Sequence, residues 1–265
     1  GQTDQYRFIF KLYRNCGDPA IPGNAASPAP GTMPICWSNA CGIPTPALPD
    51  MQLYVAAGQV LPNGNLQGAP VSYGCPNTGN KCTDLNSSLP GYQEWWYTSI
   101  ITIPGQCNNW KFWTYLNARN GNIANLVTPG SQNLFVEATF DNTNGKNFNS
   151  SPYFSNPPVP FLCINLPYTY NNGAIDNDND SLTFESIEPR NQSGCNYAPN
   201  GILLPAYNYA TNPFPTGNTF YVNPVTGATT FTATASGVYV ITIKVNEWRQ
   251  GVLIGYVLRD IQMYV

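Results

Sequence analysis

Apolar and polar side chains alternate with a period of two along much of the chain. In residues 6–13, large apolar side chains at every second position alternate with Arg7 and Lys11. Runs of this kind that are rich in Val, Ile, Thr, Tyr and Phe, and bounded by Gly, Pro and Asn, are typical of β-strands. No capped segment of ten or more residues has helical periodicity. Similar alternating runs are 51–55, 95–103, 134–140, 182–187, 219–222, 238–245 and 252–265.

The number of such runs predicts an all-β protein with two antiparallel β-sandwich domains in tandem. The Asn-rich stretch 141–152 marks the expected junction, with six cysteines before it and two after it. We therefore expect a disulfide-rich sandwich over 1–148 and an Ig-like or cadherin-like sandwich over 149–265. The loops 17–49 and 61–91 are unusually long, and disulfide stapling is the simplest explanation for them.

Eight cysteines indicate an oxidising, extracytoplasmic setting. Cys36 and Cys41 enclose one short polar loop, and Cys75 and Cys82 enclose another, so each pair is a candidate disulfide. Eight cysteines allow 105 pairings, so the connectivity stays open, and buried free thiols are the alternative. The other candidates are Cys16 and Cys107 in the first half and Cys163 and Cys195 in the second.

The charge content excludes several functions. Only 9% of the residues are charged, the formal net charge is −3, and there is no histidine. A Ser-His-Asp triad, a Cys-His pair and a His-ligated zinc or haem are therefore excluded. A nucleic-acid binder is disfavoured because it needs a clustered basic surface.

The distribution of apolar residues predicts no membrane span, because no run of 18 apolar residues occurs. The N-terminus, GQTDQYRF, lacks the charged and apolar regions of an export signal. We expect a secreted or cell-surface protein whose signal peptide has already been removed.

The acidic residues are concentrated in one place. Five of the 14 lie within residues 176–188, and Asp176, Asp178 and Asp180 alternate with asparagine in GAIDNDNDSLTF. Crowded carboxylates repel one another, and Ca²⁺ accepts six to eight oxygens from such side chains. The loop is not an EF-hand, because Ser181 stands where that motif needs glycine. We predict a calcium site here; a solvated acidic turn is the alternative, and a catalytic carboxylate pair is disfavoured.

The second half resembles a cadherin-like module. The motifs that carry this resemblance follow one another in order: NSSPYF from Asn149, AIDND from Ala174, FYVNPVTGATTF from Phe220 and GVYVITIKVNEWRQG from Gly237. The resemblance implies Ca²⁺ at a domain junction, with Asp176 and Asp178 as ligands and Asn149 as a linker ligand. The Asp-Arg-Glu motif of that family is missing, so one or two ions are implied rather than three.

The whole chain resembles large Bacteroidota surface proteins that are exported by type IX secretion and associated with gliding motility. The matching segments are YRFIFKLYRNCGD, IPGQCNNWKFWTYLNARNGNIANL, NSSPYF, PFLCIN, DNDNDSLTF and EWRQGVLIGYVLRDIQMYV. Asn15 and Ala118 depart from that pattern, which has Asp and Cys there, and the family's C-terminal sorting domain is not found. The resemblance implies an adhesive or structural extracellular role.

Aromatic residues form a second candidate binding site, after the acidic loop. Trp95, Trp96 and Trp113 lie on strand candidates, where exposed rings could stack on sugars. We favour the alternative, that these rings fill the core, because aromatic side chains bury large areas. The candidates for buried ion pairs are Arg119, Glu247, Arg249, Arg259 and Asp260, and Arg249 or Arg259 joined to Glu247 or Asp260 would lock the last hairpin.

The predicted function is a non-enzymatic extracellular adhesive or structural module that calcium makes rigid. A carbohydrate-binding module is the alternative. The expected partners are other surface proteins or glycans, or further copies of the chain in a fibre. The terminal strands 6–13 and 252–265 could pair with a neighbouring sheet edge, although closing their own sandwich is the simpler role.

Overall fold

The computed structural model describes residues 5–16, 31–71, 80–84, 86–87, 91–143, 148–158, 161–217 and 219–265. Within these ranges the protein consists of antiparallel β-sheets joined by loops, which confirms the predicted all-β class. The helical structure described there is one short 3-10 turn, Pro129–Ser131. Among the described residues, no helix has the length and apolar character needed to cross a membrane.

The chain forms two compact units, and a short segment of unit 2 lies between the two segments of unit 1 in the sequence. Unit 1 comprises Gly1–Ile35 and Leu48–Ile103, and unit 2 comprises Cys36–Ala47 and Pro104–Val265. The predicted division at residues 148/149 falls inside unit 2 and differs from this partition. The two divisions differ because the main sheet of unit 2 contains strands from both sides of residue 149, which are hydrogen-bonded to one another.

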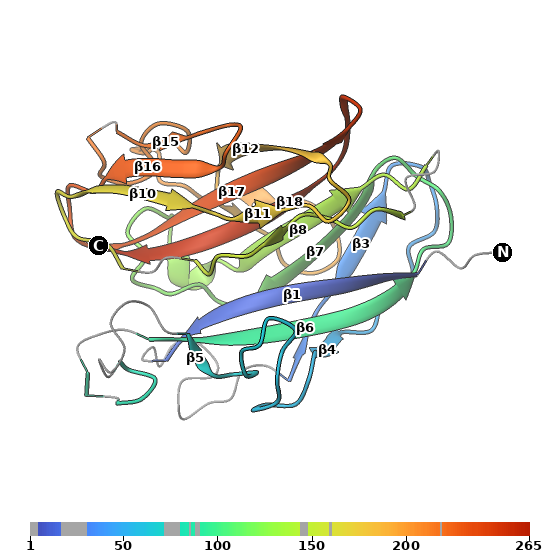
Figure 1. Ribbon diagram of the computed structural model, residues 1–265, viewed down its shortest axis with the longest axis horizontal. Coiled ribbons are helices and arrows are strands. Elements are labelled where there is room, and N and C mark those ends of the chain that lie inside the picture. Colours follow the sequence, from blue (N-terminus) through green and yellow to red (C-terminus); the bar gives the residue numbers. More distant parts are fainter. Residues whose placement is uncertain are drawn as a thin grey trace. The chain divides into compact units, whose positions relative to one another are not determined.

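Unit 1 is built on one long strand pair. Strand β1 (Gln5–Asn15) pairs with β6 (Tyr92–Thr102) over its whole length, as the blue and green strands of Figure 1 show. The sheet has the order β1-β6-β4-β2, and β5 also pairs with β6. Its other strands are β2 (Thr32–Met33), β4 (Met51–Leu53) and β5 (Pro70–Val71).

A side-chain amide attaches a loop to the central strand of unit 1. Gln67 is buried; its Nε2 donates to the carbonyl of Trp96 at 2.9 Å, and its Oε1 accepts the Trp96 backbone N–H at 3.0 Å. The glutamine oxygen therefore replaces the backbone acceptor that a neighbouring strand would provide for the Trp96 N–H, whereas the Trp96 carbonyl also accepts the backbone N–H of Tyr54 at 2.8 Å. This contact holds the preceding loop, residues 61–67, against β6.

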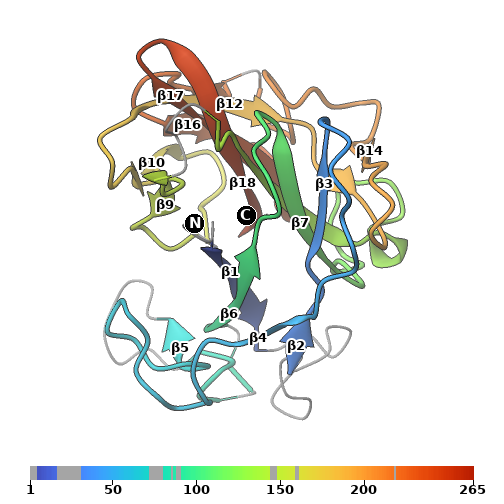
Figure 2. The same cartoon turned by 90° about the vertical axis from the view of Figure 1, so that its right-hand side faces the viewer.

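Unit 2 contains a six-stranded sheet in the order β12-β17-β18-β8-β7-β3. Its longest strands, β17 and β18, form the C-terminal hairpin, and Figure 2 shows β18, β7 and β3 within this sheet. Strand β17 is rich in Val and Ile and is buried along most of its length, as expected for a strand covered on both faces. The strands are β3 (Cys36–Asn39), β7 (Trp110–Leu116), β8 (Leu134–Phe140), β12 (Ser181–Ile187), β17 (Val238–Arg249) and β18 (Val252–Tyr264).

In the described part of unit 2, three smaller sheets accompany the six-stranded one. One has the order β10-β16-β15, and two are the strand pairs β9–β11 and β13–β14. The β9–β11 pair matters most for the site, because it joins the segment after Asn149 to the segment before Asp176. The strands are β9 (Tyr153–Phe154), β10 (Pro167–Asn171), β11 (Ala174–Ile175), β13 (Arg190–Asn191), β14 (Asn200–Gly201), β15 (Tyr221–Val222) and β16 (Ala228–Thr232).

The main core of unit 2 is aromatic and aliphatic. Phe214 is fully buried, and its ring contacts those of Phe231 at 5.3 Å and Tyr239 at 5.2 Å between centroids. Such ring pairs add about 0.5–1.5 kcal/mol each to the free energy gained by burial. Ile243 and Val245 of β17 extend the same cluster. This core supports one face of the strand that carries the site described below.

Three disulfides lie among the described residues, and they connect distant segments. They join Cys16 to Cys82, Cys36 to Cys195 and Cys41 to Cys107. The predicted short-range bridge between Cys36 and Cys41 is wrong, because Cys36 begins the extended strand β3. The strand carries the chain roughly 10 Å from Cys36 to Asn39, which exceeds the Cα separation that a disulfide permits.

The predicted bridge between Cys75 and Cys82 is also wrong, because Cys82 bonds to Cys16. Cys75 lies outside the described residues. Cys163 is exposed and is the free cysteine of the described part of the chain. The three bridges are typical of extracellular proteins, in agreement with the expected extracytoplasmic setting.

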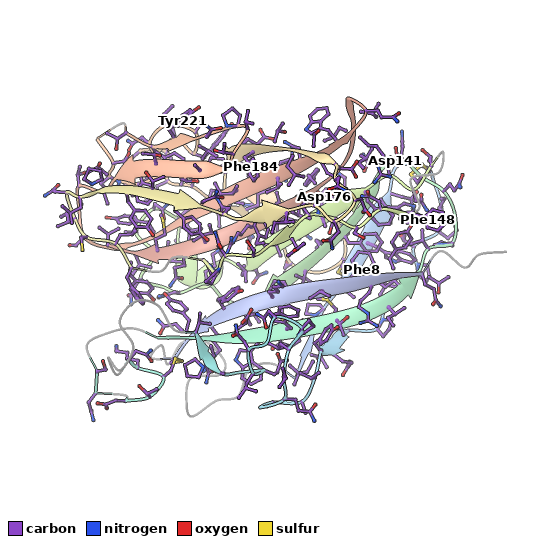
Figure 3. All side chains as sticks on the ribbon, in the orientation of Figure 1. Phe8, Asp141, Phe148, Asp176, Phe184 and Tyr221 are labelled. Atoms are coloured by element: carbon purple, nitrogen blue, oxygen red, sulfur yellow. A yellow bond between two sulfur atoms is a disulfide. The ribbon has the colours of Figure 1, made fainter. Side chains whose placement is uncertain are left out.

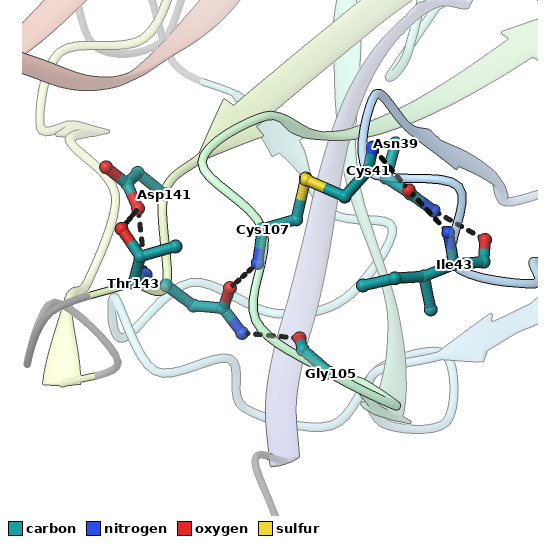
Figure 4. The surroundings of a disulfide bond; sticks show 8 residues. Asn39, Cys41, Ile43, Gly105, Cys107, Asp141 and Thr143 are labelled. Carbon is teal, nitrogen blue, oxygen red and sulfur yellow. Dashed lines mark hydrogen bonds between the residues drawn. A yellow bond between two sulfur atoms is a disulfide. The ribbon is translucent and has the colours of Figure 1, made fainter.

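Asparagine side chains hold the turns beside the bridge of Figure 4. The Oδ1 of Asn39 accepts the backbone N–H groups of Cys41 and Ile43, and the Oδ1 of Asn142 accepts that of Cys107 at 2.7 Å. Asn and Asp stabilise turns in this way because their short side chains reach nearby backbone groups. This role accounts for part of the chain's 33 asparagines.

Candidate metal centre

The acidic loop, residues 176–180, connects β11 to β12 (Figure 3). The Oδ1 of Asp176 accepts the backbone N–H groups of Asp178 and Asp180, both at 2.9 Å. Asn179 has φ 63°, a left-handed conformation that asparagine tolerates better than most residues. Together these features curl the loop so that Asp180 returns beside Asp176.

Glu247 reaches the same place from β17. It lies opposite Leu182 of β12 on one side and Gly255 of β18 on the other, and the β17–β18 register shifts between Glu247 and Trp248. Such β-bulges often change the direction of a side chain next to a functional site. A Cβ atom at Gly255 would lie 3.2 Å from the Glu247 Oε2 and 2.5 Å from a backbone oxygen. The glycine therefore leaves room for the carboxylate.

Asp176, Asp180 and Glu247 form a carboxylate trio. Each offers one oxygen, and these oxygens all lie within 4.8 Å of one another. Glu247 is 0% exposed, whereas the two aspartates are partly exposed. Ca²⁺ has ligand oxygens about 2.3–2.6 Å away, so two ligands on opposite sides of the ion are roughly 5 Å apart. One ion of this size fits among the three oxygens.

Hydrogen bonds fix at least one oxygen of each carboxylate in the trio. Asn149 donates its Nδ2 to the Glu247 Oε1 at 2.6 Å. Arg249 donates through Nε and Nη2 to the two oxygens of Asp180, at 2.9 and 2.5 Å. The Arg249 Nη2 also donates to the Asn149 Oδ1 at 2.5 Å. The trio is therefore held by a chain of contacts from β17 to the segment before β9.

Two buried carboxylate oxygens are left over. Within the part of the chain that the structure describes, the Asp176 Oδ2 and the Glu247 Oε2 have no hydrogen-bond partner. An unsatisfied buried acceptor costs about 1–3 kcal/mol, and more when it carries charge. Such a cost is expected where the oxygens serve a ligand rather than the fold alone.

The electrostatics of the site also favour a cation. Burial raises the pKa of Glu247 to about 8; the Asn149 hydrogen bond opposes this rise, and the charges of Asp176 and Asp180 add to it. The hydrogen bonds from Arg249 to Asp180 raise the pKa of the guanidinium, so Arg249 remains charged. A carboxylate with a raised pKa is one that would gain a large stabilisation from a positive ion.

The predicted metal ligands have different positions in this arrangement. Asp176 and Asp180 lie in the trio. Asp178 is exposed and accepts the backbone N–H of Ser150 at 2.5 Å. Asn149 uses its side-chain oxygen to accept from Arg249. Glu247 was predicted to form an ion pair and not to bind a metal. The feature of the sequence that could have indicated its role in the trio is that an ionisable residue follows the apolar run 238–245.

The predicted ion pairs of the closing strands are replaced by others. Asp260 accepts a bidentate pair of hydrogen bonds from Arg119, at 2.8 and 2.9 Å, and both side chains are buried. Arg259 donates to the backbone carbonyls of Asn172 and Asn156. Arg259 and Asp260 do not pair with each other because they are consecutive in β18, and consecutive residues of a strand point to opposite faces.

The tryptophans proposed for sugar stacking are buried. Trp95, Trp96 and Trp113 are 9%, 5% and 2% exposed. The Trp96 Nε1 donates to Glu94, and the Trp113 Nε1 donates to the carbonyl of Gly194. The favoured interpretation, that these rings fill the core, agrees with these positions. Their proposed contact with a glycan does not.

Comparison with protein-family models, with curated proteins and with solved structures finds no match to this chain.

Proposed function

We propose that the protein is a non-enzymatic extracellular adhesive or structural module, and that Ca²⁺ bound by Asp176, Asp180 and Glu247 makes unit 2 rigid. One observation carries this proposal: two buried carboxylate oxygens in the trio lack a partner among the described residues. A cation would satisfy both oxygens and join the acidic loop to β17. The resemblance of the sequence to exported Bacteroidota surface proteins supports the extracellular role.

Calcium suits the donor set better than other common metals. All the donors of the trio are oxygens, whereas zinc sites usually contain His or Cys ligands. Magnesium demands near-ideal octahedral geometry and retains several waters. Calcium accepts irregular sets of carboxylates and water at a partly exposed site such as this one.

A structural role agrees with the positions of the other buried acids. Glu94 accepts hydrogen bonds from Asn63, Asn65 and Trp96. Glu137 accepts from Arg190, Tyr197 and Tyr256. Carboxylates held in this way on several sides are positioned to stabilise the fold, and they leave little capacity for proton transfer to a substrate.

The test is a thermal melt of the full chain in excess EGTA and in excess CaCl₂, with binding measured in parallel by titration calorimetry. Ca²⁺ is expected to raise the melting temperature, because a ligand that binds only the folded state stabilises it, by about 2.7 kcal/mol at 100 times Kd. Hydrogen exchange should become slower in residues 148–154 and 174–182. Equal melts and equal exchange in both buffers would overturn the calcium site.

Two matched variants locate the ion. Asp176→Asn is expected to weaken calcium binding at least 30-fold, because its Oδ2 is one of the two partnerless oxygens. Asp178→Asn makes the same chemical change two residues away and is expected to weaken binding less than threefold, since Asp178 is exposed and bonds to Ser150. Similar losses in both variants would mean that the whole loop, rather than the trio, attracts the ion.

A further inference from the structure

Within the ranges that the structure describes, Arg249 is the positively charged residue in contact with the trio. It is the last residue of β17, and its guanidinium binds both oxygens of Asp180 and the side-chain oxygen of Asn149. Its ion-pair partner Asp180 has a nearly buried side chain, whereas the Arg249 side chain is partly exposed. The guanidinium thus occupies oxygens that a metal ion at this site would also seek.

The charges of the cluster also indicate that Arg249 and a metal ion would compete for the same carboxylates. The three carboxylates carry three negative charges when ionised, and Arg249 supplies one positive charge, so two negative charges remain. A divalent cation would neutralise them. Without Arg249, the protein lacking an ion would have three crowded carboxylates and no cation in contact with them, which is strongly unfavourable for a buried group.

We propose that Arg249 is an internal counterion that competes with the bound cation and thereby sets a weak affinity for calcium. This inference rests on the proposed function and concerns the regulation of that same site. The guanidinium stabilises the ion-free protein, and its charge repels an arriving cation a few ångströms away. Both effects reduce the free energy gained on binding.

The position of Arg249 allows its side chain to move away from the trio. The residues that follow it, Gln250 and Gly251, have φ values of 52° and 79° and form the tight turn of the β17–β18 hairpin. An arginine at the end of a hairpin can extend its side chain into solvent without disturbing the core. We therefore expect an affinity in the range of about 10⁻⁴–10⁻³ M that is found in extracellular calcium modules. Such a site gains or loses its ion as the outside concentration changes.

The decisive variant is Arg249→Gln, measured in the full chain. Glutamine can still donate a hydrogen bond to Asp180, but it carries no charge. The variant is expected to bind Ca²⁺ at least tenfold more tightly in titration calorimetry, and to melt at a lower temperature than the wild type in EGTA. Its calcium-induced rise in melting temperature should therefore exceed that of the wild type.

Lys244→Gln is the matched control. It removes a positive charge from the same strand, at a lysine that pairs with Glu185 at 3.0 Å and lies five residues before Arg249. Its calcium affinity should stay within about twofold of the wild type. Arg249→Lys separates charge from geometry: it keeps the positive charge but loses the forked contact with Asp180. Its affinity should fall between those of the wild type and Arg249→Gln.

The outcomes separate this inference from the proposed function. If the wild type binds calcium and Arg249→Gln binds it equally or more weakly, the counterion role is overturned while the calcium site stands. If neither protein binds calcium, the proposed function fails and this inference fails with it. If only Arg249→Gln binds calcium, the competition is supported, but a natural calcium site is not.

Discussion

Two buried glutamates, one in each unit, have opposite surroundings. Glu94 on β6 of unit 1 is 2% exposed and accepts hydrogen bonds from Tyr13, Asn63, Asn65 and Trp96. Glu247 on β17 of unit 2 is 0% exposed, accepts a hydrogen bond from Asn149, and lies beside two further carboxylates. Burial alone would raise the pKa of both residues. The donors around Glu94 outweigh burial and hold its pKa below the usual range, whereas burial raises that of Glu247 to about 8.

This difference separates a structural carboxylate from one that belongs to the proposed calcium site. The charge of Glu94 is fully solvated by neutral donors of its own chain, so the folded protein needs nothing more there. Glu247 keeps one oxygen without a partner among the described residues. Burial by itself therefore carries no functional meaning. The useful observation is whether the protein itself satisfies the buried charge.

The largest expected effect comes from Glu94→Gln. One glutamine amide group would face Asn63 and Asn65, which are themselves donors to the Glu94 Oε2. Losing these charge-assisted bonds and placing donors against donors should cost about 2–4 kcal/mol of unfolding free energy. Hydrogen exchange of the β6 amides in the full chain measures this loss. The calcium response of unit 2 should not change, and a change in it would contradict the assignment of Glu94 to structure alone.

Glu247→Gln should change the free energy of unfolding in the opposite direction. In EGTA, this variant removes one of three crowded carboxylates, and its amide can donate to the others, so the melting temperature should rise. A gain of about 1–2 kcal/mol is expected, because the folded protein no longer contains a buried carboxyl whose charged form is disfavoured by burial and by the neighbouring carboxylates. Added calcium should then produce no further rise. A variant that is destabilised in EGTA, as Glu94→Gln should be, would remove the distinction between the two glutamates.

Local sequence pattern predicted the strands well, because a period of two follows directly from strand geometry. The run 134–140 coincides with β8, and 182–187 matches β12 within one residue. The run 219–222 shortens to the two residues of β15. The pattern could not supply strand partners. Strands from both halves of the chain combine in one sheet, and such pairing depends on contacts distant in sequence.

The same limit explains which parts of the site the sequence revealed. Asp176 and Asp180 could be found because the loop is acidic within a chain that is only 9% charged. Glu247 could not, since its place in the trio depends on the register of β17 with β12 and on the bulge beside it. The predictions of the disulfide pairs failed for the same reason. Cys36 and Cys195 are 159 residues apart, and short spacing favoured the wrong partners.

The smallest expected effect is a pH dependence confined to unit 1. Because the folded-state pKa of Glu94 lies below its unfolded value, the ionised carboxylate contributes stability that is fully present above the unfolded pKa, about 4.3. That contribution is lost as the pH falls through the folded-state pKa. Between pH 5 and 3, the unfolding free energy of the wild type, from hydrogen exchange of β6, should therefore fall more steeply than that of Glu94→Gln. The other acids titrate in both proteins, so the difference between the two slopes isolates Glu94. Parallel slopes would show that the hydrogen bonds of Glu94 do not favour its charged form, and would remove the electrostatic contrast between Glu94 and Glu247.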